Sequence, residues 1–258
     1  MYKLFIGLLA ISSSAVFAVN NNLFQEFDNQ VSIGFGMSQA RSSFGTNPRV
    51  VDKTAVSQTN IVNLEAERLL NNGVWIDINA NMAFGAGPVG ASPYVNPSDY
   101  NINGKVGYAF TMANQHLQIT PYGLVGLTNI ISSAIPIVAA PTVANPQIAN
   151  IFAYTAGIGG RIEYRISRAI LVYADQLAAY NWDQSGPTQG NMPQNFVVYT
   201  STLGAKFNIV KNFQIGIKGF YNNYQPQASN FVTAPPITGF LAQPQNAIGG
   251  LISVGLTY

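Results

Sequence analysis

The sequence predicts an all-β chain folded as a transmembrane antiparallel up-and-down β-barrel of ten strands, with eight or twelve strands as the alternatives. Segments of about ten residues alternate apolar and polar side chains, as strands between two different solvents do. Charged residues make up only 9% of the chain although 48% of it is hydrophobic, whereas a soluble domain carries roughly 25% charged residues. No apolar run approaches the roughly 18 residues of a membrane-spanning helix, so helical spans are excluded.

The end of the chain shows the alternation most clearly. Residues 249–258 read GGLISVGLTY, which puts Ile252, Val254, Leu256 and Tyr258 on one face and mostly small or polar residues on the other. A last strand that ends on an aromatic residue resembles the C-terminal assembly signal of bacterial outer-membrane β-barrel proteins. The resemblance implies an outer-membrane location, contact with outer-membrane lipid and insertion by the barrel-assembly machinery.

The beginning of the chain predicts export by an independent route. Lys3 supplies positive charge, residues 4–11 form an apolar block, and small residues lead to Ala18. This is the pattern of a cleaved signal peptide, and its apolar block is too short to anchor a helix in a bilayer. We therefore expect residues 1–18 to be the signal peptide and residues 19–258 to be one barrel domain, with residues 19–28 as a polar periplasmic lead-in.

Ten segments carry the strand pattern, and their connections alternate in length. The least regular is the fifth, because Pro121 interrupts it and both faces hold apolar residues, so its register stays open. Short connections fall near residues 72, 113, 166 and 211, and long ones near residues 48, 91, 140, 188 and 235. Short periplasmic turns opposite long extracellular loops are typical of outer-membrane barrels. The expected strands are residues 30–38, 60–70, 74–84, 99–110, 116–128, 151–164, 169–180, 195–209, 213–224 and 249–258.

Outward-facing aromatic residues sort to the two ends of these strands, as the girdles of a membrane barrel do. The periplasmic girdle comprises Tyr108, Phe110, Tyr164, Phe207, Phe213 and Tyr258, and the extracellular girdle comprises Phe84, Tyr100, Tyr154, Tyr180 and Tyr221.

As an architecture the whole mature chain resembles the small bacterial outer-membrane barrels, including the OmpA-like, OmpX-like and OmpW-like proteins and the ten-stranded omptin proteases. Omptins and lipid-modifying barrel enzymes use histidine with aspartate or serine near the extracellular rim or the lipid-facing wall. The one histidine here, His116, lies beside a predicted periplasmic turn. Glu65 and Glu67 share a strand face and could act as acid and base, but lumen lining is the simpler interpretation. We expect no catalytic residue, no metal site and no cofactor, and the net charge of +2 gives no reason to bind nucleic acid.

Charged residues on the inward parity nearly balance, so we expect a charge network in the lumen. Buried charges must pair or be solvated. A salt-bridged plug that closes the narrow interior is the favoured interpretation, and a constricted channel with a mixed-charge eyelet is the alternative. The acids are Glu65, Glu67, Asp77, Glu163 and Asp175, and the bases are Lys105, Arg161, Lys206 and Lys218.

Two long connections, residues 129–150 and 225–245, contain no charged residue. Apolar loops suggest a contact, either with each other or with a hydrophobic ligand or an extracellular partner. The candidate contact residues are Ile135, Ile137, Val138, Phe231 and Phe240. The sequence thus favours a structural or surface-interaction (adhesin-like) role through extracellular loops. A narrow channel for small or hydrophobic solutes is the alternative, an enzyme is the least favoured, and whether anything crosses the barrel separates the first two.

Overall fold

The structure is a computed structural model of the chain, and it describes residues 23–45, 53–88, 98–112, 115–134, 147–184, 195–226 and 241–258. The expected signal peptide, residues 1–18, lies outside these ranges. Among the described residues, no helix has the length and apolarity required to cross a membrane. The elements are helix α2 (Gln25–Asp28) and strands β1 (Gln30–Gly45), β2 (Lys53–Leu69), β3 (Val74–Pro88), β4 (Ser98–Tyr108), β5 (Phe110–Met112), β6 (Leu117–Ala134), β7 (Gln147–Arg165), β8 (Ile170–Asp183), β9 (Phe196–Val210), β10 (Phe213–Pro226) and β11 (Leu241–Thr257).

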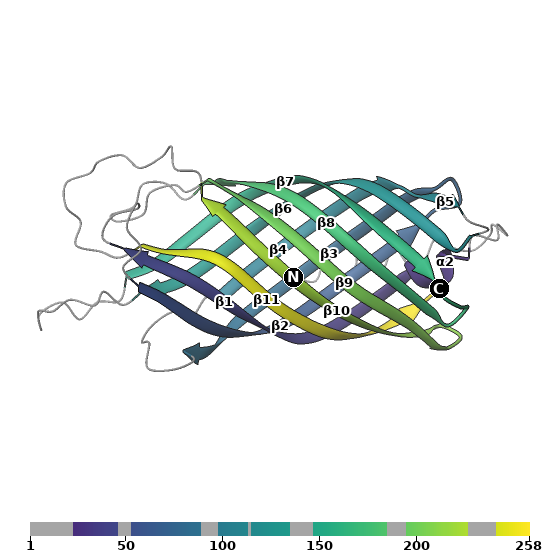
Figure 1. Ribbon diagram of the computed structural model, residues 1–258, viewed down its shortest axis with the longest axis horizontal. Coiled ribbons are helices and arrows are strands. Elements are labelled where there is room, and N and C mark those ends of the chain that lie inside the picture. Colours follow the sequence, from purple (N-terminus) through teal and green to yellow (C-terminus); the bar gives the residue numbers. More distant parts are fainter. Residues whose placement is uncertain are drawn as a thin grey trace, which may run out of the picture.

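The strands form one closed antiparallel sheet, in which neighbours in sequence pair, except β4 with β5, and β1 pairs with β11 (Figure 1). Strands β4 and β5 both pair with β6 and together occupy one of the ten strand positions of the barrel. Closure leaves no sheet edge in lipid, where unpaired backbone groups would be costly. The predicted fold class, a ten-stranded up-and-down barrel, is confirmed.

The strand that contains Pro121 is continuous, and the irregularity lies in the strand paired with it. Pro121 lies within β6, where it pairs with Gly160 of β7. On the side that faces β4 and β5, Pro121 has no N–H to donate, and the hydrogen-bonded ladder with β6 is interrupted near this residue. Register is unchanged across the gap, with Gly107 opposite Tyr122 and Phe110 opposite Ile119. The expectation that Pro121 interrupts its own strand is wrong, because the break falls at Ala109 instead.

The two faces of the sheet meet different surroundings. The most exposed apolar side chains, Ile158 at 75%, Leu203 at 69% and Val125 at 68%, all point outward. A continuous outer surface of this kind suits hydrocarbon and not water. Polar and charged side chains are buried inside, as the period of two predicts. The exterior is therefore a lipid-facing surface and the interior is a polar lumen.

The two ends of the barrel differ, as the connection lengths predict. The short turns, which include residues 70–73, 115–116, 166–169 and 211–212, and the C-terminus share one end, called here the short-turn end (Figure 1). Gly73, with φ of +86°, closes the first of these turns. The opposite end, called here the long-connection end, carries connections that lie outside the described residues.

Strands reach farther toward the long-connection end than the sequence suggested. β6 and β7 have 18 and 19 residues, whereas a tilted strand crosses the hydrocarbon with about 9–11. The predicted bounds covered only the alternating membrane part. Parts of the two expected apolar loops are therefore strand, since Ser132 pairs with Ala149 in the first and Gln243 pairs with Ser43 in the second.

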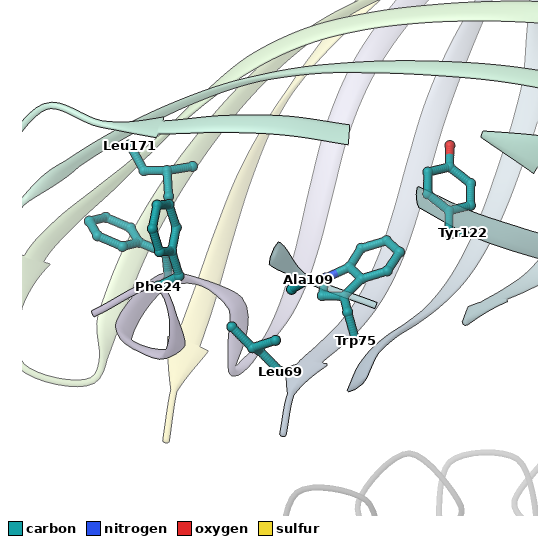
Figure 2. Packing of buried hydrophobic residues seen from close by; sticks show 7 residues of the cluster. Phe24, Leu69, Trp75, Ala109, Tyr122 and Leu171 are labelled. Carbon is teal, nitrogen blue, oxygen red and sulfur yellow. The ribbon is translucent and has the colours of Figure 1, made fainter. Parts of the chain in front are cut away.

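The segment before β1 is not the solvated lead-in that the sequence suggested. Helix α2 lies at the short-turn end of the barrel (Figure 1), and Phe24, Phe27 and Asp28 are fully buried. Phe24 and Phe27 belong to a cluster of buried apolar side chains, whose other members come from the barrel: Leu69, Trp75, Ala109, Tyr122 and Leu171 (Figure 2). Because apolar groups gain by leaving water, this cluster holds α2 inside an otherwise polar lumen.

Candidate functional site

Main-chain and side-chain hydrogen bonds fix α2 to the strands around it. Gln25 Nε2 donates to Leu69 O at 3.1 Å, and Leu69 N donates to Asn29 Oδ1 at 2.8 Å. Gln214 Nε2 and Lys206 Nζ each donate to Phe27 O at 3.3 Å. The two bonds to Phe27 O satisfy a carbonyl group that a short helix leaves unpaired at its end. Helix α2 and residues 23–29 around it, called here the plug, thus close the short-turn end.

Glu67, on β2, is the centre of the charge network above the plug. Its Oε1 accepts hydrogen bonds from Arg161 Nη1 at 2.7 Å and Trp75 Nε1 at 2.8 Å. Its Oε2 accepts from Lys206 Nζ at 2.6 Å and Gln30 Nε2 at 3.0 Å. Two cationic and two neutral donors satisfy the hydrogen-bonding capacity of this buried carboxylate in place of water. Glu67 therefore ties four strands, β1, β2, β7 and β9, and the start of β3 to one point.

Asp28 joins the plug to this network, and the sequence analysis missed it. Lys206 Nζ lies 2.8 Å from Asp28 Oδ1, and Gln118 Nε2 donates to Asp28 Oδ2 at 3.1 Å. Burial raises the pKa of the Asp28 carboxyl above its usual value, although the Lys206 ammonium opposes this shift. The signal that could have found it is the pair Phe24 and Phe27, two large apolar residues in an otherwise polar segment.

The remaining predicted lumen residues also face inward, and most of them pair. Lys218 Nζ lies 2.8 Å from Glu65 Oε2 and Lys105 Nζ lies 2.9 Å from Asp77 Oδ2. Arg161 Nη2 lies 2.8 Å from Glu163 Oε1 without hydrogen-bond alignment. Asp175 has a neutral partner, because Tyr122 donates its hydroxyl to Oδ1 at 2.5 Å. The structure thus brings together all nine lumen charges that the sequence singled out.

Aromatic rings complete this layer. The Arg161 guanidinium lies 4.3 Å from the centre of the Tyr173 ring and 5.6 Å from the Trp75 ring. Lys105 Nζ lies 5.3 Å from the Tyr122 ring. Cations over ring faces are attracted by the ring quadrupole, most strongly where water is excluded. The plug and the charged layer together fill the lumen on its short-turn side.

Three of the buried acids, Asp28, Glu67 and Glu163, have carboxylate oxygens within 4.8 Å of one another. Such a group could in principle hold a cation. Here Lys206 bridges Asp28 and Glu67, and Arg161 bridges Glu67 and Glu163. Each of the three carboxylates is thus already paired with a protein cation, and the arrangement is an ion-pair network.

The other half of the lumen is hollow. A cavity of about 290 Å³ lies between the charged layer and the long-connection end. Glu65, Lys105, Arg161, Asp175 and Lys218 form its floor with Tyr173. Its walls are neutral side chains: Ser38, Ala40, Thr59, Ile61, Asn79, Asn81, Ala83, Asn101, Asn103, Leu124, Leu177, Thr200, Thr202, Phe220, Asn222, Tyr224, Ala247 and Leu251.

One wall of the cavity is a ladder of asparagine amides across β2, β3 and β4. Asn63 Nδ2 donates to Asn81 Oδ1 at 2.7 Å, and Asn81 Nδ2 donates in turn to Asn79 Oδ1 and to Asn101 Oδ1, the latter at 3.0 Å. Asn103 Nδ2 donates to Asn101 Oδ1 at 3.1 Å. Each amide orients the next, so the wall presents donors and acceptors in fixed directions. The sequence placed Asn63, Asn79, Asn81, Asn101 and Asn103 inside but gave them no role.

The other predicted residues lie elsewhere. Ile252, Val254, Leu256 and Tyr258, the expected assembly signal, are exposed on the outer face of β11 and just beyond it. Tyr258 N donates to Asn29 O at 3.1 Å, so the chain ends against the plug. His116 is exposed at the short-turn end, with Nδ1 2.9 Å from Arg165 O. The candidate loop contacts Ile135, Ile137, Val138, Phe231 and Phe240 lie outside the described residues.

Comparison with known proteins identifies similar barrels but no family. No protein-family model matches the sequence, and no curated protein matches it. Similar solved structures include the translocator domain of autotransporter NalP from Neisseria meningitidis, with 8% identity, coverage of 100% of this chain and 95% of that chain, and a TM-score of 0.47. The outer membrane protease OmpT from Escherichia coli has 8% identity, coverage of 89% and 95%, and a TM-score of 0.43. The transport unit of the autotransporter AIDA-I from Escherichia coli has 9% identity, coverage of 98% and 97%, and a TM-score of 0.43. None of these similarities bears on activity.

Proposed function

We propose that this chain, a bacterial outer-membrane β-barrel, is a closed barrel that binds a partner or ligand from the cell exterior and does not conduct. One observation carries the proposal. The plug and the Glu67 network occupy the short-turn half of the lumen, and the cavity occupies only the half toward the long-connection end. In outer-membrane barrels the long loops are extracellular and the short turns are periplasmic. The hollow therefore faces outward and ends blind.

The chemistry of the cavity supports binding rather than catalysis. Its acids Glu65 and Asp175 are already engaged, by Lys218 and by the Tyr122 hydroxyl. His116 is at the opposite end of the barrel from the cavity mouth, as the lining of the cavity shows. A general base must reach the proton that it removes, and these groups are committed or distant. We therefore propose a non-enzymatic role.

The alternative, a narrow channel, has one observation in its favour. The plug is a separate segment held by hydrogen bonds, ion pairs and packing, so it could in principle be displaced. Displacement would have to break the Asp28–Lys206 ion pair and expose Phe24 and Phe27. Removing one partner from a buried ion pair costs about 3–5 kcal/mol, so the closed state is strongly favoured.

Single-channel recording in a planar bilayer tests the proposal. We expect no conductance steps from protein that is shown by its heat-dependent gel mobility to be folded. Two charge-reversal variants, Lys105→Glu on the cavity floor and Lys206→Glu at the plug, are recorded beside it. Stable steps in the unchanged protein, with an ion preference that shifts in Lys105→Glu, would establish the channel instead.

A further inference from the structure

The cavity has the size and definition of a small-molecule site. Ligand pockets in proteins begin at about 300 Å³, and this cavity holds about 290 Å³. Its walls are strand residues whose side-chain directions are fixed by the barrel. A site built on strands is more precise than a site built on loops.

Several polar groups of the cavity have no protein partner among the described residues. The side-chain oxygens of Asn103 and Asn222 are buried and accept no hydrogen bond there, and the same holds for Nε of Arg161 as a donor. All three residues line the cavity. Buried polar atoms are normally satisfied, and an exception calls for an explanation such as a ligand. The lining of the cavity therefore contains hydrogen-bonding capacity that the described part of the protein does not use.

The charge balance of the cavity selects against an ionic ligand. The floor cations Lys218 and Lys105 pair with Glu65 and Asp77, at 2.8 and 2.9 Å. A charged ligand would have to compete with these pairs, and breaking a buried pair is costly. The walls above the floor are neutral amides and hydroxyls. A neutral polar ligand meets this environment without disturbing it.

An aromatic wall stands across the barrel from the amide ladder. Phe220 and Tyr224 line the cavity from β10, and Asn101 and Asn103 line it from β4. These two strands are five strand positions apart in a barrel of ten, so they lie diametrically opposite each other. Gly249 lacks a side chain where the Phe220 ring lies, since a Cβ there would come within 2.5 Å of Phe220 Cζ. The wall is thus shaped to hold the Phe220 ring against the sheet.

We infer that the cavity binds a small neutral sugar, of one or two rings, from the cell exterior. Sugar hydroxyls both donate and accept, as asparagine amides do. The C–H face of a sugar ring is apolar and packs on aromatic faces, whose quadrupole is negative. An amide ladder opposite an aromatic wall satisfies both sides of such a ring. The inference deepens the proposed function and rests on it, and it covers a free sugar and the end of a glycan chain alike.

Saturation-transfer NMR tests this inference with D-glucose, D-galactose and maltose as probes, and with glucuronate and glucosamine as charged counterparts. The protein is refolded in a detergent without a sugar headgroup, because a maltoside would itself compete. Four single variants on β10 form a matched set. Phe220→Ala and Asn222→Leu alter the cavity wall, whereas Tyr221→Ala and Asn223→Leu alter the outer face of the same strand. Signals are normalised to the folded fraction.

We expect at least one neutral sugar to bind. Its affinity should fall about tenfold or more in Phe220→Ala and Asn222→Leu, as the loss of one buried contact predicts, and should not change in Tyr221→Ala and Asn223→Leu. If dextran competes with the sugar, the ligand is the end of a glycan chain, and if dextran does not compete, the ligand is a free sugar. Either result supports the inference. Binding of no neutral sugar, equal binding in all four variants, or tighter binding of glucuronate or glucosamine would overturn the inference. Because conductance tests the closed barrel separately, a silent barrel without sugar binding would refute this inference alone.

Discussion

Replacing Glu67 with alanine should lower the free energy of unfolding by about 3–5 kcal/mol, the cost of breaking a buried ion pair. The reason is the number of groups that lose their partner. Arg161 and Lys206 would each lose one of their two carboxylate partners, and the Trp75 indole N–H and the Gln30 amide would lose their acceptor. Unfolding by guanidinium chloride in lipid vesicles, followed by gel mobility and tryptophan fluorescence, measures the change.

Glu26→Ala is the matched control for this experiment. Glu26 is an exposed acid on α2, so its replacement should change the free energy of unfolding by less than about 0.5 kcal/mol. Adding Lys206→Met to Glu67→Ala should destabilise the protein further, because Lys206 still pairs with Asp28 at 2.8 Å and its removal leaves that buried carboxylate without a cation. If Glu67→Ala were no more destabilising than Glu26→Ala, the Glu67 network would not be what holds the lumen closed.

Replacing Phe27 with alanine should release the plug locally while the strands stay paired. Phe27 is fully buried, and removing such a ring costs about 3–5 kcal/mol. Since each 1.4 kcal/mol is a factor of ten, the open state of the plug should become at least about a hundredfold more populated. The chain contains no cysteine, so a single introduced thiol reports on this opening without interference.

Gln214→Cys provides that thiol, because Gln214 is 1% exposed and bonds to Phe27 O. In the Phe27→Ala background its rate of modification by a small thiol reagent should rise about a hundredfold, since the rate follows the open population. Glu26→Ala in the same Gln214→Cys background should leave the rate unchanged. A rise accompanied by loss of folded gel mobility would mean that the whole barrel had opened, and an unchanged rate would mean that α2 does not seal this end.

The period of two predicted most of the barrel, because lipid and a polar lumen impose opposite preferences on alternate residues. It placed Ile158, Leu203 and Val254 on the outer face and Glu67, Arg161 and Lys206 on the inner face, where the structure has them. It could not give the strand lengths. Beyond the hydrocarbon both faces meet water and the alternation fades, although the ladder continues to Ser132 and Ala149.

Two features of the site depend on contacts that no periodicity encodes. Asp28 precedes the first strand, and its burial follows from Lys206 and Gln118, which are far away in the sequence. The cavity results from the sizes of side chains on ten strands at one level of the barrel. The sequence predicted that the lumen is closed, but only by salt-bridged residues of the strands. It did not predict that Phe24 and Phe27, which precede the strands, take part in closing it.

If the plug closes the lumen as proposed, the cavity is open to one side of the membrane only. Thr202→Cys puts one thiol on the cavity wall, in a chain that has no other. In vesicles of known protein orientation, a small membrane-impermeant thiol reagent is added on one side at a time. The structure predicts modification from the side of the long-connection end and protection from the side of the short-turn end. Equal modification from both sides, or from neither, would contradict a lumen that is plugged below and hollow above.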